Sequence, residues 1–193
     1  MSHTLLRAIT VLAASVSLLA GCALPGRDLE TVFLPTRETW VRVYAVEDAP
    51  HTIVELVPEG QKLETWNELC TLESYAHGTG MPPPSEAVRA LESKMRARAG
   101  HVEWQVLEQD NTSVLYAWTL TGTADHPDQG EIARLIQGRD GVHRAAYAYK
   151  TLPLDPARRT YWIDLLKRAR VVKGEKEYWA AVDELMPEMR GNH

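Results

Sequence analysis

The sequence is poor in cysteine and has no surplus of positive charge, and each shortage excludes a class of protein. Two cysteines in 193 residues can form at most one disulfide, which cannot hold a fold of this size together, so a disulfide scaffold is excluded. The 21 lysines and arginines stand against 26 aspartates and glutamates, so nothing in the composition favours binding to a nucleic-acid backbone. A net charge of −5 with 45% hydrophobic residues also excludes a disordered chain. The composition is that of an ordinary globular protein of about one domain.

The apolar run near the N-terminus, residues 8–20, is too short to cross a membrane, which takes about 20 apolar residues. It follows the single positive charge of Arg7, an order typical of a secretory signal peptide. The run ends in Leu19-Ala20-Gly21-Cys22, which resembles the lipobox of bacterial lipoproteins. The resemblance implies cleavage before Cys22 and acylation of its thiol, and more than one acyl chain makes a stable membrane anchor. The alternative is an ordinary secretory signal in which Cys22 lies near the cleavage point by chance.

This reading divides the chain into a removed signal peptide (residues 1–21), a short tether (22–28) and a single α+β domain (29–193). Removal of 21 of the 193 residues leaves 172, and the loss of Arg7 changes the net charge from −5 to −6. Ala23 follows the cysteine where an aspartate would favour the inner membrane, so we expect an outer-membrane location facing the periplasm. With Cys22 acylated, Cys70 has no second cysteine for a disulfide, and its acidic and apolar neighbours favour a core thiol over a reactive one.

Alternating apolar residues dominate the first two thirds of the domain, and a period of two predicts β-strands. We expect strands over residues 40–46, 52–57, 101–108, 113–121, 131–137 and 142–150. Residues 68–76 fit either a further strand or a helical turn, because their apolar residues suit both periods.

Three helices are expected among these strands. Ser85 is a candidate N-cap for the first, which would end at Gly100. Asp155 is a candidate N-cap for the second, with Pro156 at its first position, and a third helix follows Gly174. Because the strands are joined by hairpin-length connections, the order predicts an α+β fold, an antiparallel sheet of about six or seven strands covered by helices.

Several loose motifs occur in a familiar order. Residues 59–68 lead into a strand, Pro84-Ser85-Glu86 opens a helix, Ile136-Gln137-Gly138 accompanies a hairpin, and Tyr161-Trp162 with Leu165-Leu166 lies in a late helix. Over residues 31–172 this pattern resembles small, largely uncharacterised envelope proteins of proteobacteria, whose architecture is similar to the Mog1/PsbP-like α/β/α sandwich. Some of those proteins carry a cysteine pair near the C-terminus, and this chain has none there. The resemblance implies an adaptor role, an assembly role or a role that is unknown, and no recognised enzymatic activity.

Common catalytic and cofactor motifs are absent from the sequence. It contains no Gly-x-Ser-x-Gly, His-Glu-x-x-His, P-loop, Gly-x-Gly-x-x-Gly or Cys-x-x-Cys motif. We therefore predict no catalytic residues and no cofactor.

The polar clusters that could bind a metal ion have simpler interpretations. Residues 125–131 gather carboxylates but lack the EF-hand spacing, and a plain acidic loop explains them. His101 and Glu103 share one face of a strand without a third ligand, opposite the apolar face, so they should be exposed to solvent. His77, His126 and His143 have no partner that the sequence identifies, and we predict no metal site.

The aromatic residues are unevenly distributed, with six tryptophans and seven tyrosines but a single phenylalanine. Trp104 and Trp118 should pair across a hairpin, and Tyr147 and Tyr149, which share one face of a strand, should pack under a helix. Core packing explains most of these side chains. If some are exposed near residues 78–84, then Trp104, Trp118 and Tyr116 form the candidate contact surface.

Together these features predict a lipoprotein that is held in the cell envelope by its lipid anchor. We expect its domain to act without catalysis, through contacts with an envelope protein whose identity the sequence does not give. One alternative is a binding protein for a small apolar or amphipathic ligand in a cleft between sheet and helices. A second alternative is an enzyme whose site residues are dispersed along the chain.

Overall fold

A computed structural model describes residues 29–46, 50–97, 100–122 and 127–187. The described part contains nine strands and three helices. In chain order they are β1 (Glu30–Phe33), β2 (Trp40–Val46), β3 (His51–Pro58), β4 (Glu68–Ala76), α1 (Pro84–Arg96), β5 (His101–Gln109), β6 (Ser113–Thr121), β7 (Gln129–Gln137), β8 (Gly141–Tyr149), α2 (Pro156–Lys167), β9 (Arg170–Lys173) and α3 (Gly174–Leu185). Cys22, Asp125 and His126, about which the sequence makes predictions, lie outside the described residues.

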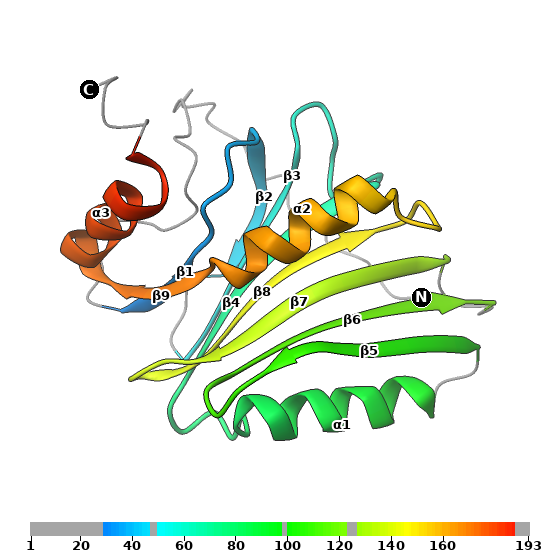
Figure 1. Cartoon of the computed structure of the whole chain (residues 1–193), viewed down its shortest axis with the longest axis horizontal. Helices are drawn as coiled ribbons and strands as arrows, with labels where there is room; N and C mark the ends of the chain where they lie inside the picture. The colour runs from blue at the N-terminus through cyan, green and yellow to red at the C-terminus, as the bar shows by residue number, and fades with distance from the viewer. Residues whose placement is uncertain (1–28, 47–49, 98–99, 123–126, 188–193) are drawn as a thin grey trace, which may run out of the picture.

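Seven strands form one antiparallel sheet in the order β2-β3-β4-β8-β7-β6-β5 (Figure 1). This confirms the predicted α+β class and the predicted antiparallel sheet. Residues 68–76, which fitted both a strand and a helix, form β4 near the middle of the sheet. Leu69 through Glu73 are all buried, because both faces of this strand are covered there, and such burial removes the alternation that normally identifies a strand.

A second, two-stranded sheet pairs β1 with β9, from Glu30 opposite Lys173 to Phe33 opposite Arg170. Neither strand was predicted from the sequence, because four residues are too few to show a period. Val32 and Leu34 from this segment are fully buried in the core beneath α2. Phe33, at the end of β1, packs instead with α3.

Helices cover the large sheet from both sides (Figure 1). α1 packs on β5, β6 and β7, where Val88 joins a core that includes Val114 and Leu135. α2 packs on β7 and β8 from the other side, and β1 contacts β4 and β8. The arrangement is therefore a sheet with one helix on one face and a helix plus the small sheet on the other.

The second helix begins and packs as the sequence predicts. The Asp155 side chain accepts a hydrogen bond from the Arg158 N–H at 2.9 Å, and Pro156 occupies the first turn. Trp162 is fully buried and stacks on Tyr147 of β8, with ring centroids 4.1 Å apart. Tyr147 thus packs under a helix, as expected.

The prediction for the start of α1 was wrong. The helix begins at Pro84, and Pro83 takes the N-cap position with an extended backbone. Its carbonyl accepts hydrogen bonds from the N–H groups of Glu86 and Ala87, so Ser85 lies inside the first turn and caps nothing. Pro83 and Pro84 impose the extended-to-helical transition themselves, two residues before the predicted N-cap.

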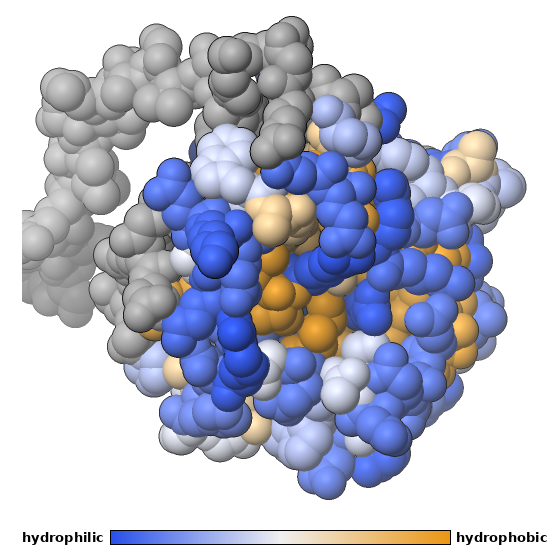
Figure 2. All heavy atoms as spheres, turned by 60° about the vertical axis from the view of Figure 1, so that its left-hand side comes forward, coloured by the Kyte–Doolittle hydropathy of each residue, from blue (hydrophilic) through white to orange (hydrophobic). Residues whose placement is uncertain are grey.

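No helix in the described part of the chain is long and apolar enough to cross a bilayer. Seen from the side of α3, the surface is mainly hydrophilic, with hydrophobic residues at the floor of a central hollow (Figure 2).

Candidate functional site

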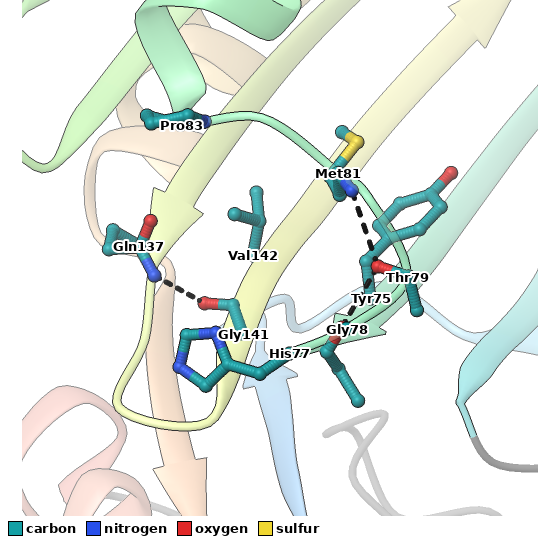
Figure 3. A pocket seen from close by; sticks show the side chains of 10 residues that line it. Tyr75, His77, Gly78, Thr79, Met81, Pro83, Gln137, Gly141 and Val142 are labelled. Atoms are coloured by element: carbon teal, nitrogen blue, oxygen red, sulfur yellow. Dashed lines mark hydrogen bonds between the residues drawn. The ribbon is translucent and has the colours of Figure 1, made fainter.

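A small cavity of about 200 Å³ lies where the loop between β4 and α1 meets the β7–β8 hairpin (Figure 3). Its walls are Tyr75, Ala76, His77, Gly78, Thr79, Met81, Pro83, Gln137, Gly141 and Val142. The loop is tied to the hairpin by two hydrogen bonds, from His77 N–H to Asp140 O at 2.9 Å and from His77 Nε2 to Arg139 O at 2.9 Å. The cavity is thus built from two turns that fix each other.

The lining of this cavity combines apolar and polar groups and contains no Asp, Glu, Lys or Arg. Met81 and Val142 supply apolar surface. The Gln137 side chain, whose Nε2 donates a hydrogen bond to Gly141 O at 2.9 Å, supplies a polar edge. Gly78 has a φ of 88°, a left-handed conformation that lets the loop turn sharply. The cavity is smaller than the 300–1,000 Å³ typical of small-molecule sites, so it fits a single side chain better than an amphipathic ligand.

On the opposite face of the sheet, the same strand ends bury a chain of polar groups. His143 of β8 is 2% exposed, with Nδ1 2.9 Å from Ser74 Oγ and Nε2 3.1 Å from Glu30 Oε2. Burial lowers the pKa of His143, so the ring is neutral at pH 7. Because a carboxylate only accepts, Nε2 donates to Glu30 and Nδ1 accepts from the Ser74 hydroxyl.

The interpretation of His143 as an isolated residue was therefore wrong. Its partners lie 69 and 113 residues away in the sequence, and no local pattern connects them. Glu30 belongs to β1, one of the two strands that the sequence analysis missed. A buried histidine on a central strand needs hydrogen-bond partners, and that requirement was the one available signal.

Glu30 acts as a clamp on the β7–β8 hairpin. Its carboxylate accepts from the N–H of Asp140 at 2.8 Å, the N–H of Arg139 at 3.0 Å and the Arg139 guanidinium at 3.0 Å. Burial alone would raise the pKa of Glu30, but these hydrogen bonds and the one from His143 lower it to about 2. The first strand of the domain thus holds the hairpin that forms one wall of the cavity.

A second polar network lies on the α1 side of the sheet. Arg144 of β8 bonds to Glu73 at 2.5 Å and to Glu131 at 2.6 Å, and all three side chains are mostly buried. Tyr75 donates to Glu73 at 3.0 Å, and burial together with Glu73 raises the pKa of Tyr75 to about 12. Since Tyr75 also lines the cavity, this network and the cavity share one face of the sheet.

The predicted contact surface is only partly accessible. Trp104 and Trp118 lie directly opposite each other on β5 and β6, which confirms the predicted pairing, and both are half-buried against the core under α1. Tyr116 is fully buried and stacks on Trp104 with ring centroids 5.2 Å apart. Including Tyr116 in a contact surface was therefore wrong, because α1 covers this part of the sheet.

The remaining candidates have structural explanations. His101 and Glu103 are exposed, as expected, with 3.7 Å between Nε2 and Oε1. Asp128 accepts from the Gly122 N–H at 3.0 Å, whereas Glu131 points into the network around Arg144. Across residues 29–46, 50–97, 100–122 and 127–187, no three His, Cys, Asp or Glu side chains gather in a way that could hold a metal ion. Cys70 is buried at 2% exposure, as predicted.

No protein-family model matches the chain, and no curated protein matches its sequence.

Proposed function

We propose that this chain is a lipid-anchored protein of the bacterial envelope, attached through Cys22 to the outer membrane on its periplasmic side. Its domain acts by binding another envelope protein and has no catalytic activity. The signal-like residues 1–21 and the lipobox-like ending at Cys22 support the anchor. The seven-stranded sheet with helices on both faces is compatible with the Mog1/PsbP-like sandwich, which we propose as its fold family.

The observation that carries the binding role is the filled space between the sheet and α2. Trp162 stacks on Tyr147 at 4.1 Å and meets Trp40 edge-on at 5.5 Å, so large rings occupy the position where a ligand cleft would lie. The cavity beside α1 is too small for an amphipathic ligand but can receive one side chain of a partner. A filled core with a surface depression favours protein contacts over ligand transport.

Site-specific photocrosslinking in cells tests this function. A benzoyl-phenylalanine placed at His77, an exposed residue of the cavity wall, should give a crosslink to another envelope protein. The same probe at Lys176, exposed on α3, is the matched control and should give none. Equal yields at both positions, or no protein adduct at His77, would contradict a binding role at this site.

One observation favours an enzyme as the second candidate. Ser74, His143 and Glu30 form a hydroxyl–imidazole–carboxylate relay, the combination that activates a serine nucleophile. Against it, His143 is 2% exposed, and the cavity lies on the other face of the sheet. Treatment with a fluorophosphonate probe decides between the two, because an activated Ser74 would be labelled and Ser74→Ala would abolish the label. We expect no label in either protein.

A further inference from the structure

The α1 side of the sheet carries a row of accessible side chains on β2 and β3, which β4 and β8 separate from the three strands that α1 packs on. We call this surface the β2–β3 face, and it consists of Val41, Tyr44, Val46, Ile53 and Glu55. The cross-strand pairs prove that they share one face, because Val46 lies opposite Ile53 and Tyr44 lies opposite Glu55. Continuing across the sheet, Glu55 lies opposite Thr71, whose own partner on β8 is Ala146 in the core under α1.

None of the helices in the described ranges packs on this part of the sheet, since α1 contacts β5 to β7, α2 contacts β7 and β8, and α3 contacts β1 and β9. Val41 is 37% exposed and Tyr44 is 43% exposed, which is high for large apolar side chains on a sheet face. Adjacent exposed apolar residues on a soluble domain mark interaction sites.

The carboxylate of Glu55 determines which chemical groups a partner of the β2–β3 face must carry. It sits half-buried in the middle of the apolar row, and within the described part of the chain it has no hydrogen bond and no ion pair. Burial raises the pKa of Glu55, and the negative charge of Glu73 nearby adds to that rise. Arg144 bonds to Glu73 and Glu131, and His51 Nε2 lies 3.7 Å from Glu73 Oε1, so these basic groups pair with other carboxylates and not with Glu55.

We infer that the β2–β3 face docks a segment of a partner protein in which a lysine or arginine is flanked by apolar side chains. The inference rests on the proposed binding function and specifies its surface. The cation of the partner would pair with Glu55, and the flanking apolar groups would cover Val41, Tyr44 and Val46. An arginine or lysine that neutralises a half-buried carboxylate forms a charge-assisted hydrogen bond, which fixes the register of the docked segment. An anionic lipid surface or a nucleic acid offers no cation to Glu55 and would be repelled by its negative charge.

The test is photocrosslinking of the full lipidated chain in cells, with benzoyl-phenylalanine at Val46. Val106, an exposed valine 46% accessible on the far edge strand β5, is the matched probe position. We expect an adduct at Val46 and none at Val106, and mass spectrometry should place the crosslink in a segment that contains a lysine or arginine beside apolar residues. Glu55→Lys should reduce the adduct at least about tenfold, whereas Glu103→Lys, the same change at a 72% exposed site, should leave it unchanged.

Exchange of the two charges gives the decisive result. Glu55→Lys combined with a glutamate in place of the identified cation of the partner should restore the adduct. The inference is overturned if the adduct survives Glu55→Lys, if the captured segment lacks a cation, or if the captured protein is a second copy of this chain.

Two readouts separate this inference from a folding defect and from the proposed function. Because Glu55 is a half-buried carboxylate without a partner, Glu55→Gln should raise the thermal midpoint at pH 7 by about 2 °C while weakening the adduct. A lowered midpoint would show that Glu55 serves stability and would overturn the inference. An adduct at His77 with none at Val46 would overturn the inference and leave the binding function standing, and no adduct at either position would overturn both.

Discussion

Glu30 is the residue on which the most distant parts of the chain converge. It follows the proposed tether in sequence, yet its carboxylate binds His143 of β8 and the backbone of the β7–β8 hairpin. Arg139, which bonds to Glu30, also reaches Glu177 of α3 with both carboxylate oxygens at 3.0 Å. One side chain therefore connects the N-terminal strand, the central sheet and the last helix.

Replacement of Glu30 by glutamine should destabilise the domain at pH 7 by about 3 kcal/mol, because the folded state holds the ionised form with a pKa near 2 against an ordinary value of 4.5. Chemical denaturation measures this change. Glu177→Gln removes a carboxylate that shares Arg139 but is 43% exposed, and it should have a clearly smaller effect.

The same shift predicts a pH dependence. A carboxyl group with a lowered folded pKa contributes stability that is fully present above pH 4.5 and is lost as the pH falls towards 2. The stability difference between wild type and Glu30→Gln should therefore shrink over that interval. A difference that stayed constant from pH 7 to pH 3 would show that the charge of Glu30 contributes nothing to folding.

At the residue scale, sequence reasoning succeeded where a side chain obeys a local rule. Asp155 caps α2 because its oxygen reaches an N–H three residues on, and Cys70 is buried because its neighbours are apolar. It failed for His143, since no rule connects a histidine with a glutamate 113 residues away.

At the scale of elements, the paired ends of β4 and β8 line the cavity, and their backbones approach each other closely there. Ala76 lies opposite Gly141, and a Cβ atom at position 141 would fall 2.0 Å from the carbonyl oxygen of Tyr75. Backbone cannot move aside as a flexible side chain can, so glycine is required at this position for the two strands to pair.

Gly141→Ala should cost about 3 kcal/mol and disturb the end of the β4–β8 pairing. Hydrogen exchange at the amides of Tyr75 and His77, which face β8 and the β7–β8 hairpin, would report that disturbance, and thermal unfolding would report the loss of stability. Gly60→Ala is the matched control, because its Cβ meets nothing within 4 Å and only the positive φ of 87° is strained, at about 1–2 kcal/mol. Unchanged amide protection at Tyr75 in Gly141→Ala would show that the strands accommodate the added Cβ without losing their pairing, which would contradict the requirement for glycine.

Long elements were predictable and short ones were not. β5 and β6 each have nine residues and show a clear period of two, and they pair with Trp104 opposite Trp118 as expected. β1 and β9 have four residues each and exist only because they pair with each other over the core. The β2–β3 face was also not predictable from the sequence, because the strands that α1 covers depend on the tertiary packing.

For the whole molecule, the sequence determines the α+β class and the antiparallel sheet, while the proposed location depends on residues 1–22 alone. Those residues lie outside the described structure, so biochemistry has to test them. In the domain that follows, the described helices pack against a sheet, and the face on the side of α3 is mainly hydrophilic (Figure 2).

Cys22→Ala should abolish incorporation of labelled palmitate and move the protein from the membrane fraction to the soluble fraction, because the acyl chains supply the anchor. Cys70→Ala is the control, since Cys70 is buried in the core and should not affect labelling. Label retained by Cys22→Ala would refute the lipid anchor.

The position of the Glu30 clamp has a mechanical consequence. If the chain is anchored at Cys22, any pull between the membrane and a bound partner enters the domain eight positions later, at the first residue of β1. The ion pair of Glu30 with Arg139 and its hydrogen bond with His143 would bear that force before the four-residue ladder between β1 and β9 is loaded. A pull on the anchor would then act directly on the β7–β8 hairpin, so the wall of the cavity would be the first part of the domain to deform.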